Sequence, residues 1–509
     1  MSNSFFIDVF SHHIVVTGFS KQGKDVLLDF CATRVGQRGL VFVGHGQYTM
    51  KLIKLFATAT KNRKEFRFHI NSLPELKIYL YQKLGNNCVI EESVHEVNHV
   101  VPVKLSVSKG YEPREKQIPI IDYLTTDKKY KLVTIQPGAG KTVLSLTAVQ
   151  RLGMRTALII PGKYVDKWIG DCKSILGIKV GELLVVRGSK DLKRLIELAM
   201  VGELKASIII ITSTTLFNYI KDYEQNSGTS DQYACKPQDF FKVLGVGVRL
   251  MDEVHQNFHL NFKIDLYTHV ATSIDLSATM DVDDQFMSRM YLLKYPRQMR
   301  YQNGAYDKYI AVTALHYSLL PETKIRTSYY GMTQYSHTAF EESILSKKKT
   351  LSNYLKLVEQ CVKNLYLKIR KPNQKLLIFA ATKEMCAVMA KDIQKYTPGL
   401  KVGKYVSEDD YSSLMNNDIS VSTYQSSGTA VDIDGLRVAI STTAIQSRQA
   451  NEQMMGRLRR LKQYPDETPE YYYFVCTDIP KHIEYSEHKF DMFKDKVLSH
   501  KVAYLRGGL

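Results

Sequence analysis

A glycine-rich loop is the stretch of this sequence best suited to chemistry. It reads Gln136-Pro-Gly-Ala-Gly-Lys-Thr142 and separates an apolar run, residues 132–135, from a helical pattern, residues 143–149. The glycines let backbone N–H groups turn towards phosphate oxygens, the lysine reaches terminal phosphates and the threonine hydroxyl can bind Mg²⁺. The helix that follows directs its positive end at the same anion. The pattern predicts an ATP-binding loop with candidate contacts Gly138, Ala139, Gly140, Lys141 and Thr142.

Two adjacent carboxylates, Asp252 and Glu253, follow a second apolar run, residues 246–251. Charges at the end of a buried strand are costly unless a cation lies beside them. Mg²⁺ bound to ATP and to Thr142 is such a cation, so we expect Asp252 to hold the metal. We expect Glu253 to orient and deprotonate an attacking water. A surface acidic pair is the alternative, which the apolar run that leads into it disfavours.

Hydroxyls follow the next apolar strand, in Ser277-Ala-Thr279. We expect Ser277 and Thr279 to relay between His255 and a bound nucleic acid. A simple turn at the end of a strand would look the same in the sequence.

Two arginines occur near the C-terminus in the stretch Gln453-Met-Met-Gly456-Arg457-Leu-Arg-Arg460. On a helix, Gln453, Gly456, Arg457 and Arg460 share one face, because they stand at i, i+3, i+4 and i+7. Guanidinium groups that reach across a cleft stabilise charge on a transferring γ-phosphoryl group, an effect worth roughly 10³ to 10⁵ in rate. A basic solvated helix is the alternative, and it does not explain the glycine.

Gln117 lies upstream of the loop, in Arg114-Glu-Lys-Gln117, just before an apolar run. A glutamine amide can donate to one adenine nitrogen and accept from the exocyclic amine. We therefore take Arg114 and Gln117 as candidate nucleotide contacts. A glutamine that merely precedes a helix is the plainer interpretation.

The elements that must position these residues alternate between short apolar runs and helical stretches, as in buried parallel sheets. The expected strands are residues 156–160, 183–186, 207–211 and 246–251 in one sheet, and 376–380, 402–406, 419–422, 438–441 and 471–476 in another. Ligands bind at the carboxyl ends of such strands. Residues suited to gripping a phosphodiester backbone follow two strands of the first sheet: Pro161, Gly162, Lys163, Thr212 and Ser213. Helix N-caps explain these serines and threonines equally well when each is taken singly. In the second sheet, Thr423 ends a strand and is followed by a glycine turn at Gly428 and by the carboxylate of Asp432.

These patterns predict an α/β protein of three domains. A small α/β or α+β accessory domain covers residues 1–108, a first lobe residues 109–325 and a second lobe residues 326–509, which ends in a basic helix near residues 481–501. Residues 51–68 interleave basic and aromatic side chains, which suits DNA or a solvated basic face equally. Residues 281–330, rich in Tyr and Arg, favour a β-ribbon over a base-stacking surface. Residues 346–370 predict a long helix.

The composition is that of an ordinary globular protein with an unusual charge. The 509 residues carry 69 Lys and Arg against 51 Asp and Glu, a net charge of +18. This excess favours a polyanionic partner over a merely basic protein. The 7 cysteines are scattered, so they indicate reduced thiols rather than zinc ligands or disulfides. The N-terminus is unlike a signal peptide and no run is long enough to cross a membrane, so we expect a cytoplasmic protein.

The order of these motifs resembles that of the superfamily 2 helicases over about residues 110–480. Among them, phage branch-migration helicases, which act on recombination intermediates and stalled forks, are the most similar. The resemblance implies two RecA-like lobes with ATP and Mg²⁺ between them. It also implies that the residues named above have the nucleotide, metal, coupling and nucleic-acid roles. DNA, whether branched, duplex or single-stranded, is the implied partner of a monomer in the host cytoplasm.

The chain departs from the family pattern at Ile135, where the loop has no first glycine, and at Arg459, where many members have glycine. Neither change removes a catalytic group. Two other functions fit the same residues. One is an RNA helicase or a factor that displaces transcripts, and the other is a non-enzymatic basic binding protein with a decayed nucleotide site.

Overall fold

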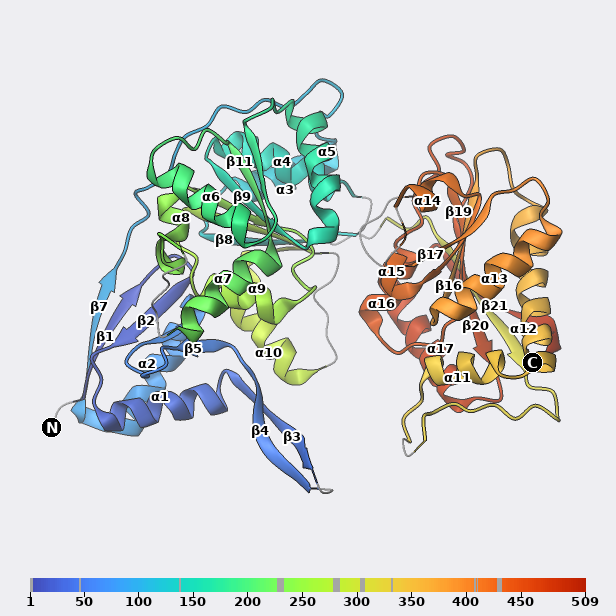
Figure 1. Ribbon diagram of the computed structural model, residues 1–509, viewed down its shortest axis with the longest axis horizontal. Coiled ribbons are helices and arrows are strands. Elements are labelled where there is room, and N and C mark those ends of the chain that lie inside the picture. The colour runs from blue at the N-terminus through green and yellow to red at the C-terminus, as the bar shows by residue number, and fades with distance from the viewer. Residues whose placement is uncertain are drawn as a thin grey trace. The chain divides into compact units, whose positions relative to one another are not determined.

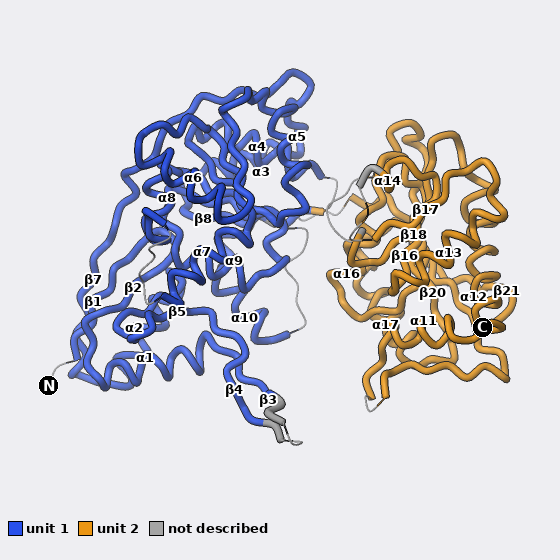
Figure 2. Tube along the Cα trace, viewed as in Figure 1, with its two compact units in different colours: residues 1–135, 139–303 blue, residues 136–138, 304–509 orange. Residues whose placement is uncertain are grey.

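The computed structural model divides into two compact units, drawn in different colours in Figure 2. The first comprises residues 1–135 and 139–303, and the second residues 136–138 and 304–509. The structure describes residues 3–44, 47–136, 139–226, 233–277, 284–302, 307–330, 333–406, 409, 411–427 and 433–509.

The N-terminal part of the first unit contains a five-stranded mixed sheet in the order β5-β6-β2-β1-β7. Its strands are β1 (Asn3–Val9), β2 (His13–Thr17), β5 (Ala57–Ala59), β6 (Phe66–His69) and β7 (Cys88–Val94). Helices α1 (Lys21–Thr33) and α2 (Leu73–Leu84) pack on each other beside it. An antiparallel hairpin of β3 (Gly36–Gly44) and β4 (Gln47–Leu55) extends away from this sheet, as Figure 1 shows.

The rest of the first unit is built on a seven-stranded parallel sheet in the order β10-β11-β9-β12-β13-β8-β14. Its strands are β8 (Tyr130–Thr134), β9 (Thr156–Ile160), β10 (Leu183–Val186), β11 (Ile208–Thr212), β12 (Val248–Met251), β13 (Thr272–Ser277) and β14 (Arg300–Gln302). The helices are α3 (Ile118–Leu124), α4 (Lys141–Leu152), α5 (Val165–Leu176), α6 (Ser189–Met200), α7 (Ser213–Gln225), α8 (Phe240–Val243), α9 (Phe258–Asp265) and α10 (Gln285–Lys294).

The central strands of this sheet are buried along their whole length. Each of the five residues of β9 and of β11 is buried, as expected where helices cover both faces. Strand β12 lies between β9 and β13, and β8 follows β13. The carboxyl ends of these strands therefore bring the glycine loop, the acidic pair and Ser277 to the same edge of the sheet.

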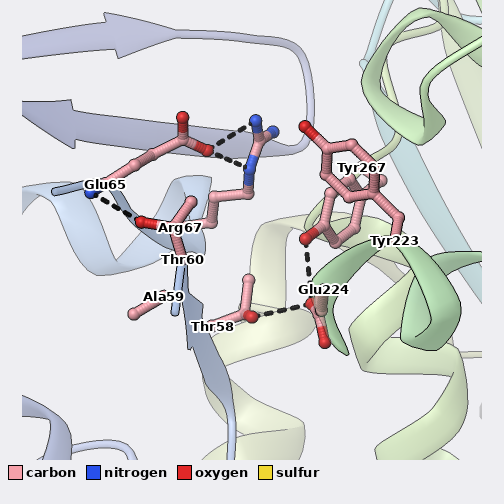
Figure 3. Close-up of a pocket in the computed structure, with 8 residues that line it drawn as sticks. All are labelled: Thr58, Ala59, Thr60, Glu65, Arg67, Tyr223, Glu224 and Tyr267. Atoms are coloured by element: carbon pink, nitrogen blue, oxygen red, sulfur yellow. Dashed lines mark hydrogen bonds and ion pairs between the residues drawn. The ribbon is translucent and has the colours of Figure 1, made fainter. Parts of the chain in front are cut away.

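The N-terminal sheet is fixed to the parallel sheet by buried polar contacts. His12 Nε2 lies 2.8 Å from Ser273 Oγ on β13, and His13 Nδ1 lies 3.1 Å from the carbonyl of Thr268. A second contact, drawn in Figure 3, surrounds Glu224, whose carboxylate accepts hydrogen bonds from Thr58 Oγ1 at 2.7 Å and from the Tyr267 hydroxyl at 2.8 Å. The accessory sheet and the first lobe thus share one buried interface.

The second unit contains another seven-stranded parallel sheet, in the order β17-β18-β16-β19-β20-β15-β21. Its strands are β15 (Ala311–Ser318), β16 (Lys375–Ala380), β17 (Val402–Tyr405), β18 (Ile419–Thr423), β19 (Leu436–Ser441), β20 (Glu470–Cys476) and β21 (Ser499–Gly508). Its helices are α11 (His337–Leu345), α12 (Lys348–Cys361), α13 (Lys383–Tyr396), α14 (Tyr411–Asn416), α15 (Tyr424–Ser427), α16 (Arg448–Met455) and α17 (Pro480–Phe493). The predicted fold class, two parallel α/β lobes with a small N-terminal domain, is confirmed.

Four local predictions differ from the structure. The basic C-terminal helix ends at Phe493, and residues 499–508 form β21, whose alternating sequence pairs in parallel with β15. Residues 281–330 do not form a ribbon where they are described, because α10 precedes two strands, β14 and β15, that enter different sheets. Strand β15 belongs to the second sheet, although the sequence placed its residues in the first lobe. The predicted helix at residues 346–370 becomes α12 and a π-helical turn at Val362–Leu367.

None of the described helices has the length and apolarity that crossing a membrane requires.

Candidate ATP site

The glycine loop is held by Gln117 at the start of the first lobe. Gln117 is buried, its Nε2 donates to the carbonyl of Ala139 at 2.8 Å, and its Oε1 accepts from the backbone N–H of Arg114 at 2.9 Å. Gly140 has a φ of +86°, and a Cβ there would lie 2.3 Å from Gln117 Nε2. Glycine is thus favoured at this position by its backbone conformation, and a Cβ there would displace the Gln117 amide. The Arg114 side chain is exposed.

Lys141 and Glu253 meet at the carboxyl edge of the sheet, where Lys141 begins α4. Lys141 Nζ lies 2.7 Å from Glu253 Oε1, and both side chains are largely buried. The backbone of Glu253 has a φ of +51°, a left-handed conformation that costs a non-glycine residue about 1–3 kcal/mol and is concentrated at functional sites. The turn after β12 therefore directs this carboxylate at the lysine of the glycine loop.

Asp252 is held beside this pair by the chain's only tryptophan. Trp168 Nε1 on α5 donates to Asp252 Oδ2 at 3.3 Å, and the backbone N–H of Glu253 donates to Asp252 Oδ1 at 2.9 Å. Burial, and then the charge of Glu253, raise the pKa of Asp252. A nearby cation would stabilise the ionised carboxylate and so oppose both effects on the pKa.

His255 links the acidic pair to the neighbouring strand. Its Nδ1 lies 2.8 Å from Ser277 Oγ at the end of β13 and 3.4 Å from Glu253 Oε2. Burial lowers the pKa of His255 to about 4, so its imidazole is neutral at neutral pH. His255 therefore contacts both Ser277 and Glu253 through the same ring nitrogen.

The donor set fits Mg²⁺ that enters with a nucleotide. Thr142 and Asp252 offer a hydroxyl and a carboxylate oxygen, and Mg²⁺ in proteins takes one or two such ligands beside waters and substrate phosphates. The raised pKa of Asp252 indicates a buried carboxylate whose ionised form a cation would stabilise.

The candidate nucleic-acid residues of the first lobe lie at adjacent strand ends. A Cβ on Gly162, after β9, would lie 3.9 Å from the Thr212 methyl group, at the end of β11. Thr212 Oγ1 accepts from the backbone N–H of Thr215 at 3.4 Å and so caps α7. Ser213 is buried in the first turn of that helix, and Lys163 Nζ lies 5.0 Å from the Tyr164 ring centroid. In the second unit, Thr423 Oγ1 accepts from Ser426 N at 3.3 Å at the start of α15. Thr212 is therefore the N-cap of α7, and Thr423 makes the corresponding hydrogen bond at the start of α15.

The arginine segment does not form the predicted helical face. Helix α16 ends at Met455 and Gly456 is its C-cap, so Gly456, Arg457 and Arg460 do not continue the turn that carries Gln453. Arg459 Nη1 donates to the carbonyls of Gly456 and Leu458, and such bonds satisfy groups left open at a helix end. Arg457 is buried, with 3% of its surface exposed, whereas the side chain of Arg460 is 59% exposed.

Four predicted site residues lie outside the described residues: Gly138, Thr279, Gly428 and Asp432. Their roles remain predictions.

No family model matches the chain, and no curated protein matches it in sequence. Among solved structures it is similar to S. cerevisiae Dbp5 bound to RNA and ADP BeF3, with a TM-score of 0.50 and 9% identity over 77% of this chain and 90% of that chain. A single-residue variant of Dbp5 with the same ligands gives a TM-score of 0.51 at 9% identity and the same coverage. A fragment assigned as an HsdR subunit of a type I restriction enzyme from Vibrio vulnificus gives 0.48 at 14% identity, over 77% of this chain and 68% of that chain.

The chain has a fold of two tandem RecA-like lobes, each built on a parallel sheet.

Two side chains that contact candidate site residues were missed in the sequence. Trp168 contacts Asp252, and being the only tryptophan, soon after Pro161-Gly-Lys163, it could have been noticed. Asp307 contacts Arg460, but nothing in the sequence around Asp307 distinguishes it from other acidic residues between two strands.

Proposed function

We propose that this protein is an ATP-driven DNA translocase that unwinds or remodels branched DNA, such as forks and recombination junctions. The observation that carries the proposal is the Lys141–Glu253 contact of 2.7 Å beside the buried Asp252. A lysine that ends a glycine loop, next to a carboxylate pair at the same edge of the sheet, is what γ-phosphoryl transfer to water requires. The basic net charge of +18 supports a polyanionic partner.

Each residue of the site has a proposed task. Lys141 leaves Glu253 to bind the terminal phosphates, which frees the carboxylate to orient and deprotonate the attacking water. Thr142 and Asp252 would hold Mg²⁺, which neutralises charge on the phosphates when bound. Gln117 and Arg114 contact the nucleotide at the base side, and Gln453, Arg457 and Arg460 complete the site during hydrolysis.

Coupling to nucleic acid is proposed to run through neighbouring strand ends. Glu253, His255 and Ser277 form a continuous chain of contacts, and it leads to the end of β13. Both contacts are made by Nδ1 of His255, so a single ring nitrogen lies between the Ser277 hydroxyl and the Glu253 carboxylate. The strand ends at Pro161–Lys163, Thr212 and Thr423 are the proposed backbone grips, and residues 1–108 are a proposed further DNA contact.

The variant Glu253→Gln tests the assignment. We expect ATP binding to persist and hydrolysis to fall by about 10²-fold or more, because the amide cannot accept the water proton. Hydrolysis is measured by phosphate release with single-stranded DNA present, and binding by titration with a fluorescent ATP analogue. Glu203→Gln, at an exposed position of the same unit, is the matched control. Hydrolysis at the normal rate by Glu253→Gln would contradict the proposal.

A second candidate function is an ATP-driven enzyme with the same site that acts on RNA instead of DNA. The similar Dbp5 structure is bound to RNA, and phosphate contacts at strand ends do not distinguish the two polymers. ATPase rates on forked DNA, four-way junctions, single-stranded DNA and RNA at one stated salt concentration separate them, since affinity depends steeply on salt. Stimulation by RNA alone would favour the second candidate.

A further inference from the structure

The side chain of Arg460 is held by a carboxylate that has no assigned role. Arg460 Nε lies 3.2 Å from Asp307 Oδ2, and Nη2 lies 2.7 Å from Asp307 Oδ1. Two parallel N–H···O bonds of this kind fix the plane of a guanidinium group as well as its place. Asp307 lies in the segment that leads into β15, far along the chain from Arg460 but in the same unit.

Aromatic packing completes the holder. The guanidinium carbon of Arg460 lies 5.1 Å from the centroid of the Tyr309 ring, within the range of a cation–π contact. The Tyr309 hydroxyl donates to the carbonyl of Leu458 at 3.2 Å, which ties the segment of Asp307 to the turn that carries Arg460. We call Asp307 and Tyr309 the holder of Arg460. The holder is tied to the turn that carries Arg460 by a hydrogen bond of its own, so it does not depend on the ion pair alone.

The pair is nevertheless open to exchange. The side chains of Arg460 and Asp307 are 59% and 48% exposed. Exposed ion pairs are weak because water screens them. A γ-phosphoryl group is tetrahedral, but two of its terminal oxygens can accept from the same pair of donors and it carries more negative charge, so arginine binds either anion through two parallel bonds.

We propose that Asp307 is a positioning residue that holds the Arg460 guanidinium between turnovers, and that the γ-phosphoryl group of ATP displaces it. The inference rests on the proposed function, since it takes Arg460 as the residue that meets the γ-phosphate. The carboxylate keeps Arg460 ordered but occupied, so hydrolysis starts only when the nucleotide competes successfully for it. The contact thereby lowers the rate in the absence of nucleic acid.

The test compares Asp307→Asn with a matched control. An exposed pair contributes enough to change the population of the free guanidinium by up to about fivefold. We therefore expect Asp307→Asn to raise kcat without nucleic acid by about two- to fivefold and to leave KM for ATP unchanged. Asp307→Ser should behave alike, and Asp307→Glu should retain the low rate because it keeps the carboxylate. Asp434→Asn removes another exposed acid paired with a lysine of the same unit, Lys462, and should change nothing.

Two further variants separate this inference from the proposed function. Arg460→Ala should abolish most hydrolysis, and Asp307→Asn should have no effect in that background. An Arg460→Ala protein with normal hydrolysis would refute the role of Arg460 and the holder together. An inactive Arg460→Ala protein, combined with an unchanged or lower kcat for Asp307→Asn, would refute the holder alone.

Discussion

Substitution of Lys294 tests whether the buried charges behind the ATP site act as a balanced set. Lys294 Nζ lies 2.7 Å from Asp265 Oδ2 and 3.6 Å from Asp275 Oδ2, and its side chain is 2% exposed. Arg249, on β12 ahead of Asp252, contacts both carboxylates. Two cations thus balance two anions. His12 and His69 complete the surroundings as neutral groups, because burial lowers the pKa of both.

The variant Lys294→Met leaves one buried carboxylate without a compensating charge. Breaking a buried ion pair by removing one partner costs about 3–5 kcal/mol, whereas replacing both partners is often neutral. We therefore expect a loss of this size for Lys294→Met and recovery of at least about half of it in Asp265→Asn/Lys294→Met. The free energy of unfolding is measured by urea titration, with the fluorescence of Trp168, the only tryptophan, as a probe of the first unit.

The same variant has a predictable pH dependence. Burial alone would raise the pKa of Asp265, but the charges of Arg249 and Lys294 outweigh burial and hold the pKa well below its ordinary value. Stability from this depressed pKa is present above the unfolded value of about 3.9 and is lost as pH falls through the folded value. Without Lys294 the folded pKa rises towards the unfolded value, so the stability lost on acidification is smaller and the loss is complete at a higher pH. A single variant within about 1 kcal/mol of the wild type, or a double variant as unstable as the sum of its parts, would refute the charge-balance argument.

Two further predictions concern the loop and the second unit. Gly140→Ala should weaken ATP binding about tenfold or more, because a Cβ would lie 2.3 Å from Gln117 Nε2 and displace the amide that holds the loop, at a backbone φ of +86°. Gly170→Ala has open space around its Cβ and is the control in the titration with a fluorescent ATP analogue. Equal affinities of the two variants for ATP would contradict the reasoning. Burial raises the pKa of Glu341 to about 7, so the stability contributed by its protonated form is present below about pH 4.5 and is lost as pH rises through the folded pKa. The Tm of the wild type should therefore decrease between about pH 5.5 and about pH 8, and the Tm of Glu341→Gln should decrease less. Parallel curves of Tm against pH would contradict this.

The strands and their carboxyl ends could be predicted because buried parallel strands have continuous apolar sequences. The runs at residues 156–160 and 183–186 coincide with β9 and β10. The end of α16 could not be predicted in this way, because Gly456 fits a helix interior and a C-cap equally and the choice depends on what Arg459 contacts. Similarly, β21 follows a helix without an obvious stop, and only its pairing with β15 makes it a strand.

The same distinction applies to the candidate site: some of its contacts could be predicted from the sequence and others could not. The contact of Lys141 with Glu253 follows from motif order and from the rule that the carboxyl ends of parallel strands lie at one edge of a sheet. The contacts made by Trp168 and Asp307 depend on how a helix or a connecting segment packs against a distant turn. Such packing is a property of the folded chain, and neither residue stands in a pattern with a period or spacing of its own.

The two large sheets have equivalent strand orders, and this makes the differences between them informative. Position by position, β10-β11-β9-β12-β13-β8-β14 corresponds to β17-β18-β16-β19-β20-β15-β21. Strands β11 and β18 are equivalent, and each ends in a threonine that caps the next helix. The Thr212 and Thr215 hydroxyl oxygens lie 2.6 Å apart, and those of Thr423 and Ser426 also lie 2.6 Å apart.

The threonine cap, which both lobes have, and the ATP-site motifs, which only one lobe has, suit different ligands. A polymer with regularly spaced phosphates can be held by the same cap in both lobes, because each helix start presents backbone N–H groups to an anion. A single nucleotide has no such repeat, so it does not need the same residues in both lobes. Accordingly, the glycine loop follows only β8, the acidic pair only β12 and the arginine turn only α16. If both caps grip the polymer, then replacing Thr212 or Thr423 by valine should lower nucleic-acid affinity by similar factors and leave ATP hydrolysis without nucleic acid unchanged. Unequal losses would show that the symmetry of the fold is not a symmetry of binding.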